Sequence, residues 1–151
     1  MLITFVSCKK EKTYLYDVNP VTVQQSGSVK NNVKNNTEFI SIAYADLFGT
    51  NVSQSDLVEL NTLYNAFGDQ KLIEDRIILN MINSSGVQIP ITPSVSGDTV
   101  QFINNTYKKL YNRDATAFEK YYFKESIRTN SNVTPVMVYY ALMTADEYRF
   151  Y

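Results

Sequence analysis

The chain has 151 residues, 44% hydrophobic and 19% charged, which is the balance of one ordinary globular domain with a single core. Its 14 basic and 15 acidic side chains give a net charge of −1, so no basic excess is available to neutralise a nucleic-acid backbone. The lack of histidine and the single cysteine exclude Cys/His zinc sites, histidine-dependent nucleophile systems and c-type haem attachment. We therefore expect no metal, no cofactor and no nucleic-acid partner.

The N-terminus, Met1–Lys12, is a short apolar run followed by the only cysteine and a charged stretch. Phe5–Cys8 resembles the end of a bacterial lipoprotein signal peptide, in which the cysteine becomes the first mature residue and carries the lipid. The resemblance implies a signal-peptide remnant over residues 1–7 and anchoring to the lipid bilayer through lipidated Cys8, at about 0.8 kcal/mol per buried CH₂. The alternative is a free thiol in an unstructured tail. The stretch is similar to lipoproteins of the Bacteroidetes, which implies the outer membrane, on either its periplasmic face or the cell surface.

Residues 8–36 follow as a stretch rich in Asn, Ser, Gln and Val. This composition cannot bury enough apolar surface to fold alone, so it predicts a flexible, extended tether. Thr13–Val18 and Val21–Gln25 alternate enough to form short strands when a partner is bound.

The remaining residues, 37–151, contain an internal repeat, because Gln101–Tyr151 repeats Glu38–Asn83 without a gap, at the fixed offset that takes Glu38 to Gln101. Apolar positions and helix-start residues fall in phase in the two copies. The matched pairs include Phe39 with Phe102, Ile40 with Ile103, Tyr44 with Tyr107, Leu47 with Leu110, Phe48 with Tyr111, Ser53 with Thr116, Asp56 with Glu119 and Leu79 with Leu142. The pattern predicts an all-α bundle of about six helices in two related three-helix units, residues 37–86 and 98–151, joined by a connector, 87–97.

In the first unit, apolar residues at helical spacing and residues that favour capping predict three helices. The helices are Thr37–Phe48, Gln54–Phe67 and Gln70–Asn83, with Asn36, Ser53 and Asp69 as their N-caps. In the middle helix we expect the inward positions to be Leu57, Leu60, Leu63, Tyr64 and Phe67.

The connector cannot be helical, because Pro90, Pro93 and Gly97 interrupt it. Its apolar residues are expected to cross the bundle as an extended strap. At its end, Asp98–Val100 resembles the Asp-Ser/Thr-aliphatic motif of O-glycan acceptors in exported Bacteroidetes proteins, which implies glycosylation of Thr99. The alternative reading, which is not exclusive, makes Asp98 the N-cap of the next helix, with Gln101 completing the capping box.

In the second unit we expect helices over Thr99–Tyr111 and Ala117–Thr129, a third beginning at Thr134-Pro135, and a last turn opened by a capping box at Thr144–Glu147. Thr116 and Glu119 form a full capping box for the middle helix. The positions that this helix should turn to the core are Phe118, Tyr121, Tyr122 and Ile127.

The second unit resembles a helical module of uncharacterised bacterial surface and secreted proteins, and more loosely phycobilisome linkers. The module has the pattern F-V-x-x-x-Y-x-x-L-L-x-R, an acidic helix start and then A-L-L-x-S-x-E-Y. The matching residues are Phe102, Tyr107, Leu110, Arg113, Glu119, Leu142, Glu147 and Tyr148. The resemblance implies a scaffolding or docking unit, and an ion pair between Arg113 and Glu147. In the first unit Thr50 replaces the arginine.

Paired carboxylates could do acid–base chemistry, and spacing alone offers Asp56–Glu59, Glu74–Asp75 and Asp146–Glu147. Helix-start carboxylates that complement the helix dipole, and exposed faces, explain these pairs better, so we expect no catalytic residues and no enzyme. The sequence favours an accessory or docking lipoprotein, a subunit of an outer-membrane protein complex. The alternative is a surface lipoprotein that binds a glycan through tyrosines. The tyrosines considered for glycan binding are Tyr107, Tyr111, Tyr121, Tyr122, Tyr139 and Tyr140. Core packing should account for most of them.

Overall fold

The computed structural model describes residue 30, residues 32–90 and residues 99–150. Within these ranges the chain forms six α-helices, one short 3₁₀ helix and no strand beyond a single isolated bridge, so the predicted all-α fold is confirmed. The helices of the first unit are α1 (Asn36–Phe48), α2 (Gln54–Ala66) and α3 (Gln70–Ile82). Those of the second are α4 (Thr99–Tyr111), α5 (Ala117–Thr129), α6 (Pro135–Met143) and the 3₁₀ helix η1 (Asp146–Arg149).

The first two helices of each unit repeat with the expected offset. The first and last residues of α4 follow those of α1 by the same number of residues that separates Phe102 from Phe39. The same offset relates α5 to α2 and the cap Thr116 to the cap Ser53. The α1 and α4 helices also bury matched residues: Phe39 with Phe102, Ile40 with Ile103 and Leu47 with Leu110. The two units therefore share one helical frame.

The third helix of each unit departs from that offset. The buried residues of α3 include Ile77, Ile78, Met81 and Ile82, and those of α6 are Val138, Tyr139, Leu142 and Met143, which match them one for one at a shorter offset. Leu142 therefore takes the place of Met81, and the expected pairing with Leu79 is wrong. The physical reason is that the loop before α6 is longer and α6 lacks a turn that α3 has, which changes its register on the core.

Two expected caps are also different. The N-cap of α1 is Asn35, one residue before the expected Asn36, and it forms a full capping box with Glu38. Thr144 does not open the last turn, because its hydroxyl donates to the carbonyl of Tyr140 at 2.8 Å and so closes α6. The 3₁₀ helix η1 instead follows Ala145, which has no side chain to cap it.

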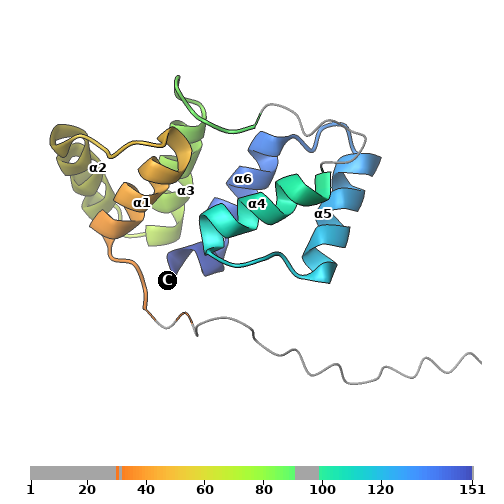
Figure 1. Ribbon diagram of the computed structural model, residues 1–151. Coiled ribbons are helices and arrows are strands. Elements are labelled where there is room, and N and C mark those ends of the chain that lie inside the picture. The colour runs from red at the N-terminus through yellow and green to blue at the C-terminus, as the bar shows by residue number, and fades with distance from the viewer. Residues whose placement is uncertain (1–29, 31, 91–98, 151) are drawn as a thin grey trace, which may run out of the picture.

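The C-terminal turn joins the two units into one core. Figure 1 shows η1 between the helices of the first unit and α4, while α3 packs against α6. Tyr148 of η1 is 0% exposed, its ring meets the edge of Phe39 at 5.9 Å, and its hydroxyl donates to Asp46 at 2.7 Å. The last turn thus places an aromatic ring of the second unit in the core of the first.

The segment that enters α1 is tied to the same turn. The backbone N–H of Lys34 donates to the carbonyl of Arg149 at 2.8 Å, its ammonium donates to the carbonyl of Tyr148, and Val33 bridges Phe150 in antiparallel fashion. The composition predicts Lys34 in the flexible tether, but the structure buries it. Within the described residues, contacts with the helical domain therefore begin before α1. Residues 1–29, which include the expected signal remnant and most of the tether, lie outside the described residues.

The connector is extended where it is described. Ile89 is buried and Val87 is partly buried against the core, as expected for an apolar strap, and the N–H of Gln88 donates to the carbonyl of Leu47 at 2.7 Å. Its remaining residues, 91–98, lie outside the described ranges.

Candidate functional site

Two residues expected to be modified, or to guide modification, cannot be located. Cys8 and Asp98 both lie outside the described residues. Thr99 is the first residue of α4 and is partly exposed. This placement fits a glycan acceptor and also fits the first turn of a capped helix, so both readings of Asp98–Val100 stay open.

The structure brings Arg113 and Glu147 together. Two nitrogens of the guanidinium donate to the two oxygens of Glu147, each at 2.7 Å, and two donate to Glu119 at 2.8 and 2.9 Å. The guanidinium carbon lies 4.9 Å from the ring centre of Tyr107 and 5.5 Å from that of Tyr111. This arginine cluster joins the end of α4, the start of α5 and η1.

The charges of the cluster support one another. Burial opposes ionisation of Glu119, but hydrogen bonds from Arg113 and Thr116 more than offset it and lower the pKa of this carboxyl from 4.5 to about 2. Hydrogen bonds from Arg113 also lower the pKa of Glu147, and the two carboxylates raise the pKa of Arg113. A permanent cation between two stably ionised carboxylates is an arrangement that fixes helix ends.

The carboxylates Glu74 and Asp75 do not lie on an exposed face, contrary to the prediction from the sequence. Glu74 is only 6% exposed, accepts a hydrogen bond from the Tyr64 hydroxyl and pairs with Arg149 at 2.9 Å. Asp75 accepts a hydrogen bond from the Tyr140 hydroxyl. Both carboxylates therefore serve to join α3 to neighbouring elements, and both are occupied by these contacts.

Four of the six tyrosines considered for glycan binding lie in the core or, like partly buried Tyr140, pack against it, as expected. Tyr107, Tyr111 and Tyr139 are buried, and the Tyr111 hydroxyl donates to the carbonyl of Leu142 at 2.7 Å. Burial raises the pKa of all three tyrosines above the ordinary value of 10. These rings are not accessible to a ligand.

The exposed aromatics are on α5, where the expected orientation is wrong. The sequence predicts that Phe118, Tyr121 and Tyr122 face the core, but they are 73%, 66% and 56% exposed. Ile127 packs against the core as expected, and Phe123, which was not expected there, joins it and meets the edge of the Tyr107 ring at 6.2 Å. The aromatic and aliphatic residues of α5 cover more of its circumference than one neighbouring helix can bury, so some of their side chains must face solvent.

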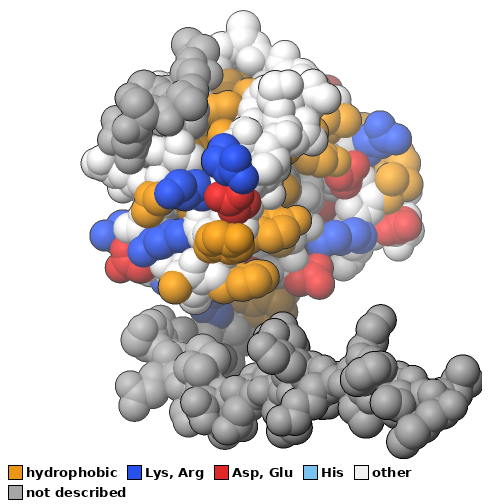
Figure 2. All heavy atoms as spheres, turned by 90° about the vertical axis from the view of Figure 1, so that its right-hand side faces the viewer, with side chains coloured by type: hydrophobic (Ala, Val, Ile, Leu, Met, Phe, Trp, Pro, Cys, Tyr) orange, Lys and Arg blue, Asp and Glu red, His pale blue; other side chains and the backbone are white. Residues whose placement is uncertain are grey.

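We call Phe118, Tyr121 and Tyr122 the aromatic ridge. The rings of Phe118 and Tyr122 are stacked, with centres 6.2 Å apart and planes at 23°. In Figure 2, which views the molecule from the side on which α5 lies, hydrophobic side chains gather in the middle of the face with charged side chains around them. Large exposed aromatic groups of this kind mark interaction sites on soluble domains.

The sister helix serves as an internal reference for the ridge. At the positions that the repeat pairs with the ridge, α2 has Ser55, Val58 and Glu59. The same helical frame therefore folds without aromatic residues on this face. The stability of the frame does not explain why α5 has the aromatic ridge.

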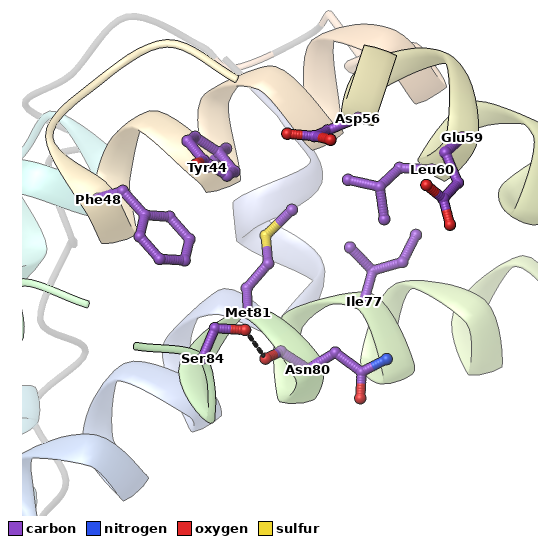
Figure 3. Close-up of a pocket in the computed structure, with 9 residues that line it drawn as sticks. All are labelled: Tyr44, Phe48, Asp56, Glu59, Leu60, Ile77, Asn80, Met81 and Ser84. Atoms are coloured by element: carbon purple, nitrogen blue, oxygen red, sulfur yellow. Dashed lines mark hydrogen bonds between the residues drawn. The ribbon is translucent and has the colours of Figure 1, made fainter. Parts of the chain in front are cut away.

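A second surface feature is a hollow of about 250 Å³ in the first unit, shown in Figure 3. The rings of Tyr44 and Phe48 are stacked at its side, with centres 4.3 Å apart and planes at 27°. Buried Ile77 and Met81 form its floor. Its full lining consists of Tyr44 and Phe48 from α1, Asp56, Glu59 and Leu60 from α2, Ile77, Asn80 and Met81 from α3, and Ser84 just beyond it.

The polar rim of the hollow is acidic. Asp56 and Glu59 are exposed, none of the lining residues is basic, and the described residues provide no hydrogen bond or ion pair to either carboxylate. Spacing in the sequence singles out this pair but gives no indication of the rings beside it. That information lies in the packing of three helices, because Tyr44 and Phe48 come from a different element.

Comparisons with models of protein families, with curated proteins and with solved structures found no match. Within the described ranges, no helix combines the length and apolar character needed to cross a membrane. The same part of the chain has no group of three or more His, Cys, Asp or Glu residues placed to hold a metal ion.

Proposed function

We propose that this chain is a non-enzymatic docking lipoprotein, a subunit of an outer-membrane protein complex that is anchored through lipidated Cys8. The aromatic ridge on α5 is the observation that carries the proposal, because three large rings are exposed at positions that the sister helix fills with Ser, Val and Glu. Burying such rings against a protein contributes about 25 cal/mol per Å² of apolar surface removed from water. Aromatic residues are also enriched among those that dominate protein interfaces.

The docking proposal is tested by recovering the full chain and its bound proteins from host membranes in mild detergent. The ridge variant Phe118→Ser/Tyr122→Glu gives α5 the residues that α2 has at the same positions. The control, Leu63→Ser/Phe67→Ser, removes two apolar side chains of the first unit that are about half exposed, at 45% and 49%. We expect a stoichiometric partner with the wild type and the control, and its loss with the ridge variant.

A Cys8→Ala form separates anchoring from docking in the same experiment. If lipidation only places the chain at the membrane, this form should keep the partner when the two are mixed in detergent. Equal recovery of the partner by the wild type and the ridge variant would refute docking through α5.

The alternative function is binding of a surface glycan, and one observation favours it. Tyr121 and Tyr122 are exposed close to the ion pair between Glu125 and Arg128, at 2.7 Å, so flat rings and polar groups lie on one helix. Sugar arrays with the wild type and Tyr122→Ala would separate the two functions, because a docking subunit should be indifferent to sugars. Tyr111, which the sequence also offers for sugar binding, is buried and is unsuited to this test.

A further inference from the structure

The arginine cluster of the second unit has a counterpart in the first. The residues around the guanidinium of Arg113 include Tyr107 and Tyr111, which lie under it, and Glu119, which accepts two of its hydrogen bonds. In the alignment of the two units these correspond to Tyr44, Phe48 and Asp56, and all three line the hollow. Phe123, which packs against Tyr107, corresponds to Leu60, which also lines it.

The backbone takes the same path at both sites. Gly49 ends α1 with φ of 69°, and Asn112 follows α4 with φ of 55°, so both chains turn through the left-handed region at the same step. A residue with positive φ directs the following side chain back along the end of the helix. That following residue is Arg113 in the second unit and Thr50 in the first.

The first unit therefore keeps the residues of the aromatic pair, stacked here where Tyr107 and Tyr111 meet edge to face, and keeps the carboxylate of a cation site. The position that supplies the cation is a threonine. Glu59 adds a second carboxylate at the rim, where the second unit has Tyr122. Two carboxylates beside two stacked aromatic rings favour binding of a cation over binding of a neutral or anionic group. The rim of Asp56, Glu59, Asn80 and Ser84 is exposed, which leaves an approach from solvent.

We propose that the hollow binds an arginine side chain of a protein partner. A guanidinium is planar, stacks on aromatic rings and donates parallel hydrogen bonds to carboxylates, which are the contacts that Arg113 makes in the second unit. Lysine, a point charge on a flexible stem, reproduces them less well. This surface is separate from the aromatic ridge, and the inference holds whether or not the ridge contacts the same protein.

The first test uses the full chain and N-acetyl-arginine amide as the probe, with N-acetyl-citrulline amide as its neutral isostere. The readout is the change in NMR shift of the Tyr44 and Phe48 rings during titration. We expect saturable shifts with the arginine probe, shifts at several-fold higher concentration with N-acetyl-lysine amide, and none with the citrulline probe. No shift with the arginine probe, or equal shifts with citrulline, would overturn the proposal.

The second test supplies the guanidinium from within the chain. In Thr50→Arg the new side chain should occupy the hollow in the way that Arg113 occupies its own site. The response to the arginine probe should then fall at least tenfold. Thr50→Gln, whose side chain is polar but neutral and shorter than that of arginine, is the control and should leave the response unchanged. Asp56→Asn should weaken binding of the arginine probe about fivefold. This substitution removes a charge from an exposed residue and does not alter the core.

Recovery of partners from host membranes then distinguishes the possible sources of the cation. If a partner arginine fills the hollow, Thr50→Arg should lower its recovery while Thr50→Gln should not. A response to the probe without any effect on recovery would mean that the hollow takes a free organic cation, and the docking proposal for this surface would be wrong. The ridge variant should leave the probe response intact, so failure of the ridge and failure of the hollow are separate results.

Discussion

The first unit, α1–α3, and the second unit, α4–η1, have the same helical frame but expose different chemistry. In the second unit a guanidinium from the chain itself covers the rings of Tyr107 and Tyr111, and the aromatic ridge of α5 faces solvent. In the first unit the equivalent rings border an open hollow with an acidic rim, and the helix equivalent to α5 has no aromatic residue at the ridge positions. The buried positions therefore define the frame, while the exposed positions differ in chemistry between the two units.

The two units should nevertheless unfold together, because Tyr148 belongs to the cores of both. Tyr148→Ala removes a fully buried ring and its hydrogen bond to Asp46, and we expect a loss of about 4 kcal/mol in the free energy of unfolding. Urea denaturation followed by circular dichroism measures this loss. Phe118→Ala, which truncates an exposed ring, is the control and should change stability little. A loss below about 1 kcal/mol for Tyr148→Ala would mean that the units are independent.

Removal of the second unit's own cation should have the next largest effect. Arg113→Met keeps the aliphatic stem but leaves Glu119 and Glu147 without their partner, and we expect a loss of about 2 kcal/mol. Arg128→Met, at an exposed ion pair within α5, is the matched control and should cost at most about 0.5 kcal/mol. Equal losses in the two variants would show that the arginine cluster has no special role.

The same cluster predicts how stability depends on pH. The folded pKa of Glu119 is about 2, below its ordinary value of 4.5, so the folded state binds this proton less readily than the unfolded state does. The contribution is therefore fully present above pH 4.5 and is lost as the pH falls toward 2. Part of this loss overlaps with that of Arg113→Met, because protonation of Glu119 weakens its contacts with Arg113 as well as its hydrogen bond from Thr116. In Arg113→Met this part of the acid dependence should shrink, because only the hydrogen bonds from Thr116 still lower the pKa of Glu119, whereas an unchanged acid profile would contradict the assignment.

The ridge should have the smallest effect on stability. Phe118→Ser/Tyr122→Glu alters only exposed side chains, so the free energy of unfolding should change by less than about 0.5 kcal/mol while partner recovery falls. Thermal unfolding beside the membrane experiment checks both expectations. A large loss of stability would place these rings in the fold itself and would remove the reason for assigning them to an interface.

The frame could be predicted from the sequence because the information that defines it is local. Capping residues such as Ser53 and Thr116 and the apolar spacing of α1 and α4 each mark an element within a few residues. The register of α6 could not be predicted in this way, because Leu142 is apolar in either alignment and only packing against the rest of the unit selects its place. The bounds of the first two helices in each unit were predictable to within one residue.

The candidate surfaces depended on tertiary contacts and were harder to predict. Phe118 and Phe123 look alike in sequence, and only the position of α4 determines which ring is covered. The contact between Arg113 and Glu147 was expected only through the resemblance to a helical module. That Glu119 shares the guanidinium depends on how closely the end of α4 approaches the start of α5, and residue spacing does not predict that distance. Cys8 and the residues around it lie outside the described ranges, so lipidation stays a prediction.

The most direct test of the relation between the two units is a double-mutant cycle in the first one. Thr50→Arg should raise the free energy of unfolding by about 0.5–1 kcal/mol, since it places a guanidinium over Tyr44 and Phe48 and beside Asp56. When Asp56→Asn is also present, most of this gain should vanish. A gain that persists without the Asp56 carboxylate, or no gain at all, would contradict the conclusion that the hollow is the counterpart of the arginine cluster.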